Sequence, residues 1–304
     1  MDVTGSGGYI MKRVLGWKIE KEVEWYLFFV LLIGWFFGFI MTSRQFSQET
    51  INLAYYIFLF SPMLVALFFL LYDTELLKKV LKNVFSLRAL IFSLVGVGII
   101  YLIIILTVLL LTWLGFLIPG PRFQSLGLED FTFWNCLAFI IKYFFIVLVT
   151  AIIPGVFTGL GEEVGWRGFL QHKLSQRHYF SKTVTIVSFF WFIWHLPVIL
   201  YRSGYDLNAV LFNGLNMFIL VVVLTVILGF FFRMTESVLV VALMHVANNV
   251  FQDITSTLFL VRQDIVWIKL FTYMLYMAIF AIIILIFFRK ELNIVNVFNL
   301  KGKS

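Results

Sequence analysis

Long uninterrupted runs of apolar residues constrain this chain more than any other feature of its sequence. A helix needs about 20 apolar residues to cross a hydrocarbon core of about 30 Å. Of the 304 residues 62% are hydrophobic and only 13% are charged, and the mean hydropathy is +1.00. This composition is typical of membrane proteins and excludes an ordinary soluble domain. Eight stretches have the required length, at approximately 25–42, 51–72, 89–118, 134–160, 183–201, 214–233, 237–258 and 266–288.

The expected fold is therefore an all-α, polytopic transmembrane bundle of about eight spans. The apolar character is continuous, whereas barrel strands would alternate apolar and polar residues over about 10 positions. We expect a polar N-terminal tail at 1–24, one membrane domain at 25–288 with its motifs in 155–255, and a basic tail at 289–304. Between the second and third spans, residues 73–88 mix leucines with lysines, which predicts a short interfacial helix.

Lys and Arg residues predict the orientation, because cytoplasmic connections retain positive charge. With eight spans, one side of the membrane has Lys12, Arg13, Lys18, Lys21, Lys78, Lys79, Lys82, Arg88, Arg167, Lys173, Arg177, Lys182, Arg233, Arg289, Lys290, Lys301 and Lys303, and the other has only Arg44, Arg122, Arg202 and Arg262. Both termini are therefore expected in the cytoplasm, with the protein in the cell membrane. The net charge of +7 is spread over connections, so nucleic acid is not an expected partner.

Ionisable residues inside spans are costly and usually functional, and the first group follows the fourth span. On a helix, one arc would carry Glu162, Glu163, Trp166 and Arg167. Within this arc, Glu163 and Arg167 have the i,i+4 spacing of an ion pair. The opposite arc is a small-residue surface that allows close approach of another helix. It consists of Gly161, Gly165 and Gly168.

Two further polar groups lie in the fifth and seventh spans. His195 is about 12 residues into the fifth span, roughly 18 Å deep, and Pro197 frees backbone carbonyls near it. In the seventh span one polar stripe has the spacing i, i+3, i+4 and i+7. It comprises His245, Asn248, Asn249 and Gln252.

A single intramembrane His or Asn is often a packing contact between helices, and a Glu–Arg pair is often an anchor. Two carboxylates, two imidazoles and amides from three spans favour one shared cavity, which we expect to face the cytoplasm.

The order of these motifs resembles the family of CAAX prenyl endopeptidases and bacteriocin-processing proteins, also called the CPBP or ABI family. The pattern is Glu-Glu-x-x-x-Arg, then aromatic-x-x-x-His, then His-x-x-x-Asn, on successive apolar segments. It covers about 90 residues, and Trp191 stands where the family usually has Phe. The matching positions are Glu162, Glu163, Arg167, Trp191, His195, His245 and Asn249.

The resemblance implies an intramembrane endopeptidase that cuts a peptide or membrane protein near the cytoplasmic leaflet. It implies Glu162 as general base with His195 as its partner, and His245 with Asn249 as the oxyanion site. Glu163, Arg167, Trp191 and Asn248 would support these four residues. No cofactor is required by this chemistry.

Three alternatives remain open at this stage. Zinc held by Glu162, His195 and His245 would perform the same hydrolysis. A non-catalytic scaffold or bacteriocin-immunity protein of the same family would keep the cluster as structure. A proton-coupled carrier also uses buried Glu and His, but we see neither an internal repeat nor polar residues of the outer half that would line a path through the membrane. The oligomeric state is not predicted.

The length of the fourth span raises a geometric problem. A straight helix from Trp134 would place Glu162 roughly 42 Å along its axis, beyond the hydrocarbon core and away from His195. We therefore predict a bend near Pro154 and Gly155 that lowers Glu162 into the bundle.

Overall fold

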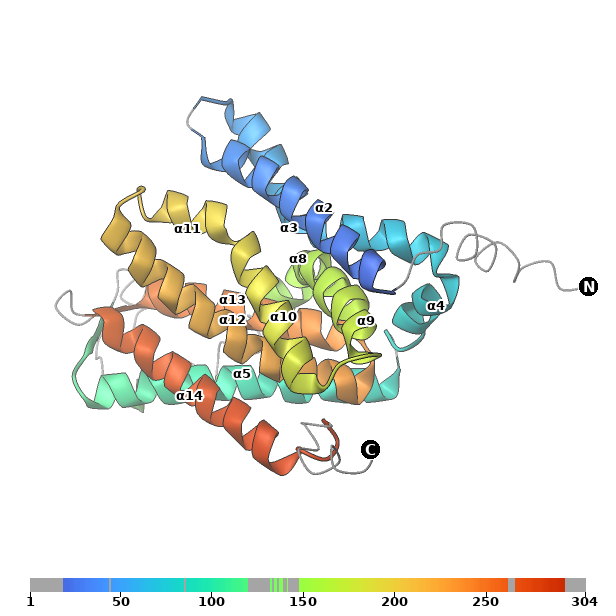
Figure 1. Ribbon diagram of the computed structural model, residues 1–304. Coiled ribbons are helices and arrows are strands. Elements are labelled where there is room, and N and C mark those ends of the chain that lie inside the picture. Colours follow the sequence, from blue (N-terminus) through green and yellow to red (C-terminus); the bar gives the residue numbers. More distant parts are fainter. Residues whose placement is uncertain are drawn as a thin grey trace, which may run out of the picture.

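The computed structural model describes residues 19–292 except for 44, 85, 120–131, 133, 136, 139–140, 142–147 and 262–265. It is a bundle of helices, with one short pair of strands among the described residues (Figure 1). The elements are α2 (Ile19–Thr42), α3 (Gln48–Tyr72), α4 (Thr74–Lys82), α5 (Leu87–Trp113), β1 (Leu117–Pro119), η1 (Leu148–Ile152), α8 (Ile153–Glu163), η2 (Val164–Gln171), α9 (His172–Ser175), α10 (Phe180–Trp194), α11 (Leu196–Arg202), α12 (Leu207–Thr235), α13 (Val238–Leu258), β2 (Phe259–Val261) and α14 (Val266–Phe287).

The helical class is confirmed, and the strands are a small addition to it. β1 and β2 pair antiparallel, with Leu117 opposite Val261, and join the end of α5 to the end of α13. Among the described residues, four helices are long and apolar enough to cross a membrane: α2, α3, α5 and α12. A fifth is obtained if α10 and α11, which meet at a 46° bend, form one span. Shorter apolar helices cover Val238–Asp253 and Phe271–Phe287.

Glycines in α8 and η2 let the helix that carries the acidic motif pack closely on its neighbours. A Cβ on Gly165 would lie 2.5 Å from the Pro62 carbonyl oxygen of α3, and one on Gly161 would lie 3.0 Å from Phe60. The predicted close approach is therefore correct for these two glycines. Gly168 faces Val238 of α13 instead. Gly159, which the sequence pattern did not include, also faces α13.

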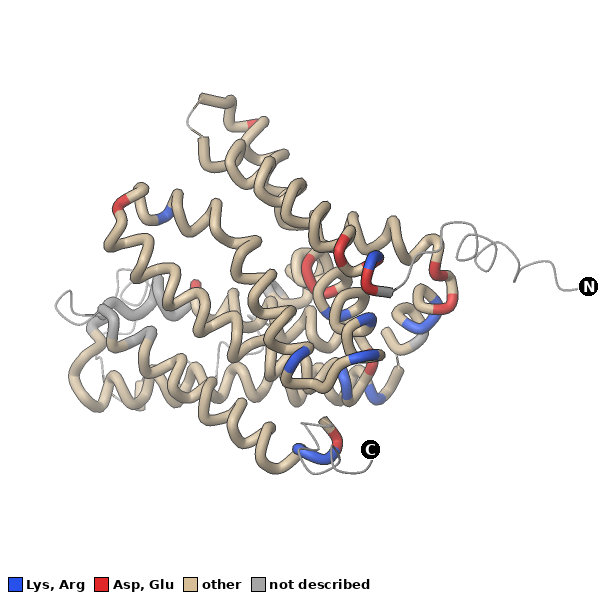
Figure 2. Tube along the Cα trace, in the orientation of Figure 1, with Lys and Arg blue, Asp and Glu red and all other residues tan. Residues whose placement is uncertain are grey.

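Lys and Arg residues gather at the end of the bundle that lies near both termini (Figure 2). We call this the basic end. There Lys173 of α9 donates to Glu22 of α2 at 2.7 Å and to Asp73, which caps α4, at 2.8 Å. Burial alone would lower the pKa of Lys173, but these hydrogen bonds outweigh burial and raise it. The contacts join segments that are far apart in the sequence at one end of the bundle.

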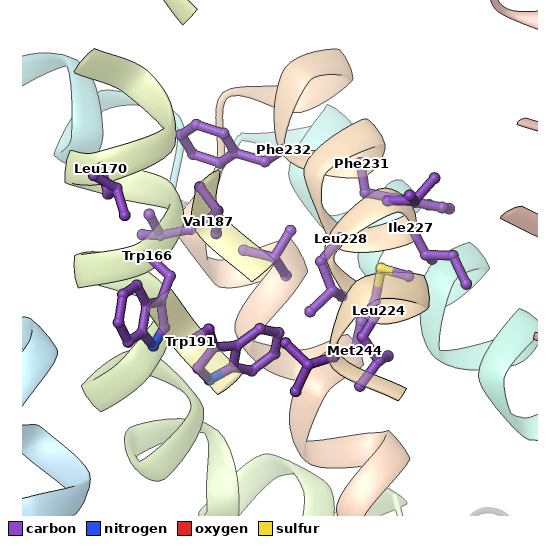
Figure 3. Close-up of a cluster of buried hydrophobic side chains, with 14 of the residues drawn as sticks. Trp166, Leu170, Val187, Trp191, Leu224, Ile227, Leu228, Phe231, Phe232 and Met244 are labelled. Atoms are coloured by element: carbon purple, nitrogen blue, oxygen red, sulfur yellow. The ribbon is translucent and has the colours of Figure 1, made fainter. Parts of the chain in front are cut away.

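A layer of large apolar side chains fills the bundle between the basic end and its middle. η2 contributes Trp166 and Leu170, α10 contributes Val187 and α12 contributes Phe231, and each of these is at most 2% exposed (Figure 3). Fully buried rings of this size pack at the density of a protein core. These side chains therefore belong to the core that packs η2 against α10 and α12.

The acidic motif lies in the bundle interior, as the predicted bend requires. The π-helical stretch η1 ends where α8 begins, and Pro154 is in the first turn of α8. Proline at this position costs no helix hydrogen bond, and π-helical turns accompany changes in helix direction. Most of residues 134–147, where the predicted fourth span begins, lie outside the described residues. Glu162 is 6% exposed and contacts Trp191, so it does not lie at a helix end in solvent.

Candidate active site

The predicted site residues from three segments line one cavity. Glu162 comes from the last turn of α8, His195 from the bend between α10 and α11, and His245 from α13. The cavity has a volume of about 670 Å³, within the ~300–1,000 Å³ that ligand pockets occupy. Its lining also includes Trp191, Asn248 and Asn249. The tertiary structure thus brings together the groups that the sequence predicted to share a cavity.

Trp191 connects the carboxylate to the first histidine. Its indole Nε1–H donates to Oε2 of Glu162 at 2.8 Å, and its backbone carbonyl accepts from Nδ1 of His195 at 2.8 Å. A carbonyl can only accept, so Nδ1 of His195 carries the proton and Nε2 of the neutral ring is a proton acceptor. The guanidinium of Arg167 lies 4.3 Å from the centre of the Trp191 ring, a cation–π contact that fixes the ring.

Glu163 has a larger role than the sequence predicted. Its Oε1 accepts from Nη1 of Arg167 at 2.9 Å, which confirms the i,i+4 pair, and also from Nδ1 of His245 at 2.8 Å. Glu163 and Arg167 are fully buried, and His245 is 5% exposed. A carboxylate that binds one ring nitrogen fixes the orientation and tautomer of a histidine. Glu163 therefore orients His245 as well as holding its own helix.

Asn248 orients the neighbouring Asn249 through a small amide network. Nδ2 of Asn248 donates to Oδ1 of Asn249 at 3.0 Å, while Oδ1 of Asn248 accepts from Gln252 at 3.2 Å and from the hydroxyl of Tyr273. Because the carbonyl oxygen of Asn249 is occupied, its Nδ2 is the group that it can offer to a ligand in the cavity. Asn249 lies one helical turn from His245, so both border the same part of the cavity.

The donor groups do not surround a common point at which a metal ion would bind. No group of three His, Cys, Asp or Glu side chains in the described part of the chain is arranged to hold a metal ion. The zinc set of Glu162, His195 and His245 therefore does not fit a zinc site in this conformation.

Three features of the site were not predicted. The indole N–H of Trp191 binds Glu162, although the sequence indicated only an enlarged ring at this position. Tyr273 of α14 joins the amide network, and no sequence signal distinguishes it from other tyrosines. Asn213 and Asn216, from the first half of α12, line the cavity although they belong to no motif.

The fold and the site define a class: a helical membrane protein in which two carboxylates, two imidazoles and asparagine amides form a buried cluster beside a cavity. Residues 132–251, which contain every motif position, match the family model described as type II CAAX prenyl endopeptidase Rce1-like. This part of the chain is therefore similar to the CAAX prenyl endopeptidase family, as the motif order indicated.

A curated relative is CAAX prenyl protease 2 of Methanococcus maripaludis. The two sequences are 27% identical over 120 residues, which is 34% of this chain and 44% of the relative. The chain therefore matches less than half of the length of that relative.

Proposed function

We propose that this protein is an intramembrane endopeptidase in which Glu162 activates a water molecule for attack on a peptide bond. The observation that carries the proposal is the single cavity lined by Glu162, His195, His245 and Asn249. One oxygen of Glu162 is held by Trp191, which leaves the other for water. A positioned carboxylate of this kind is a general base.

The proposed reaction uses the described groups in a fixed order. Glu162 takes a proton from water, assisted by Nε2 of His195, and the water oxygen attacks the peptide carbonyl. The resulting oxyanion accepts hydrogen bonds from Nδ2 of Asn249 and from His245. The C–N bond then breaks as the proton passes from Glu162 to the departing amine, which restores the carboxylate.

The charges of the cluster support a donor role for His245. Glu162 and Glu163 together carry two negative charges, and Arg167 supplies one positive charge inside the bundle. An imidazolium at His245 makes the buried cluster neutral, which burial favours strongly. With Nδ1 bound to Glu163, the imidazolium presents an Nε2–H to the cavity, and this N–H is the proposed oxyanion donor.

We further propose eight spans in the cell membrane, with the basic end and both termini in the cytoplasm. The substrate is a peptide or membrane protein in contact with the bilayer. A prenylated C-terminal peptide is one candidate because the relative is named a prenyl protease. The proposed cut lies near the cytoplasmic leaflet, which rests on the charge pattern of the connections.

A carrier is less well supported than an enzyme. Polar side chains of the outer half do line the cavity, among them Asn213, Asn216 and Asp253. On the basic side, however, the buried layer around Trp166 and Leu170 closes the path. A carrier would need polar residues through that layer as well.

The test compares the membrane proteins of cells that produce the wild-type chain or the Glu162→Gln variant. We expect peptides with new termini, detected by mass spectrometry, in wild-type membranes only. Glu75→Gln on the exposed surface of α4 is the matched control and should leave these termini unchanged. If Glu162→Gln leaves all termini as in the wild type, the endopeptidase proposal is wrong and a non-catalytic scaffold or immunity protein becomes the better account.

A further inference from the structure

Four buried polar atoms around Glu163 have no hydrogen-bond partner among the described residues. They are Oε2 of Glu163, Nε and Nη2 of Arg167, and the hydroxyl oxygen of Tyr26. All three side chains are fully buried. Buried polar groups in folded proteins are almost always paired, either with protein atoms or with ordered water, because an unpaired group costs free energy. This cluster therefore requires a partner other than the described side chains.

Tyr26 brings its hydroxyl from α2 to the helix that carries the acidic motif. The hydroxyl oxygen lies 2.5 Å from the point that a Cβ on Gly165 would occupy, so the missing side chain at Gly165 leaves space for it. Tyr26 is close enough to Glu163 and Arg167 to interact electrostatically with both. Trp166 packs edge-on against the Tyr26 ring, with ring centres 6.3 Å apart. The hydroxyl is therefore fixed beside the Glu163–Arg167 pair.

The guanidinium of Arg167 keeps unused donors at its edge. Its Nη1 donates to Oε1 of Glu163 at 2.9 Å, and its carbon lies over the Trp191 ring at 4.3 Å from the ring centre. The five N–H donors of a guanidinium lie in its plane, so stacking on a ring occupies none of those on Nε and Nη2. These donors need an acceptor, whereas Oε2 of Glu163 needs a donor.

Water is the ligand that suits this mixture of groups. A water molecule donates and accepts, and a buried one typically makes about three hydrogen bonds to groups that lack other partners. The hydroxyl of Tyr26 can serve it in either role. A bound cation would be repelled by Arg167, and a bound anion by Glu163.

We infer that Tyr26, Glu163 and Arg167 bind a buried water molecule, and that Tyr26 positions the Glu163 carboxylate through it. Glu163 in turn accepts from Nδ1 of His245 at 2.8 Å. Tyr26 lies outside the described lining of the cavity, so it acts through Glu163 and is a positioning residue. Its effect on cleavage rests on the proposed function, whereas the water site does not.

The first measurement is the structure in nanodiscs by electron cryomicroscopy with a bound antibody fragment, at a resolution that shows ordered water. For the wild type we expect a solvent density at ~2.7–3.2 Å from the Tyr26 hydroxyl and from the Arg167 guanidinium. In Tyr26→Phe the density should weaken or disappear, and the Glu163 carboxylate should turn from its wild-type position. Tyr276→Phe removes a hydroxyl from a partly buried ring that packs on the core, and this control should keep the density.

The second measurement separates kcat from KM, because a loss of packing alone would lower stability without this separation. With a peptide that spans a cleavage site, Tyr26→Phe should lower kcat about 3- to 10-fold with little change in KM, as expected for one lost hydrogen bond. Tyr276→Phe should keep the wild-type kcat. Rates are compared per folded protein, as measured by thermal unfolding.

A wild-type map without solvent density at this place would overturn the inference. So would a Tyr26 hydroxyl that donates directly to Glu163 or to the carbonyl of Pro62, which lies beside Gly165 as well. Wild-type kcat in Tyr26→Phe would overturn the positioning role. Absence of cleavage by every variant, including the wild type, would instead count against the proposed function, while the map still decides whether the water site exists.

Discussion

Replacing Trp191 by Phe removes one hydrogen bond from the proposed general base and little else. The substitution keeps an aromatic ring beside Arg167 and leaves the backbone carbonyl that binds His195. It removes the Nε1–H that donates to Glu162 at 2.8 Å. A hydrogen bond to a charged group contributes about 1.5–3 kcal/mol. If the transition state loses that amount, kcat falls about 10- to 100-fold, since ~1.4 kcal/mol is a factor of ten.

Trp194→Phe is the matched control, because it removes the same group from the same helix. Its Nε1–H donates to the hydroxyl of Ser61 at 3.1 Å, and its ring stacks on Phe58. Trp191 and Trp194 are both at most 2% exposed, so the two substitutions should cost similar packing energy. Both variants are expected to unfold at a somewhat lower temperature than the wild type.

The assay measures kcat and KM in nanodiscs with a peptide that spans a cleavage site found in the membrane comparison. We expect a lower kcat with little change in KM for Trp191→Phe, and wild-type kcat for Trp194→Phe. A wild-type kcat in Trp191→Phe would refute the positioning role of the indole N–H. An equal loss of kcat in both variants would show that packing, not the hydrogen bond, is responsible.

Four further results are expected. Gly165→Ala should lower the free energy of unfolding by about 1–3 kcal/mol, because its Cβ would overlap the Pro62 carbonyl, and thermal unfolding measures the loss. Lys173→Met should cost about 3–5 kcal/mol by the same assay, because it removes the ammonium group that pairs with two partly buried carboxylates. Since the pKa of Lys173 is raised, its stabilisation is present at neutral pH and is lost only as the pH rises above 10.5. Treatment with a zinc chelator followed by dialysis should leave cleavage unchanged.

Controls distinguish these effects from general damage. Gly98→Ala places a Cβ where no atom lies within 4 Å and should not destabilise the protein. Lys78→Met removes an exposed pair and should cost less than about 1 kcal/mol. Wild-type stability in Gly165→Ala or Lys173→Met would contradict the packing and charge arguments. Loss of cleavage after chelation, with recovery on adding zinc, would restore the metal alternative.

The helices were predictable because their cause is local. Apolar runs of bilayer length and capping residues are features of the local sequence. The predicted ranges agree with α3 and α5 to within a few residues at each end of the two helices. The bend at His195 could be anticipated from Pro197, and the close approach at Gly161 and Gly165 from their spacing. Where the predicted fourth span crosses 134–147, most residues lie outside the described part of the chain.

Contacts between segments far apart in the sequence were less predictable. Helical phase indicated that Glu163 would pair with Arg167, which lies four residues away. It could not indicate that the same oxygen also binds His245, 82 residues away, because that contact depends on how α8 and α13 cross. Trp191 and Tyr273 were missed as hydrogen-bond donors for the same reason.

The sequence by itself indicated that this protein folds in a membrane, which polar residues share its cavity, and which family residues 132–251 resemble, since hydropathy and motif order are properties of the chain. Only the tertiary structure decided which atoms of those residues are held and which are free to react. It also decided which residues outside the motifs line the cavity, among them Asn213 and Asn216. That choice depends on how whole helices pack against one another, and side-chain packing across helices is not encoded in any one segment.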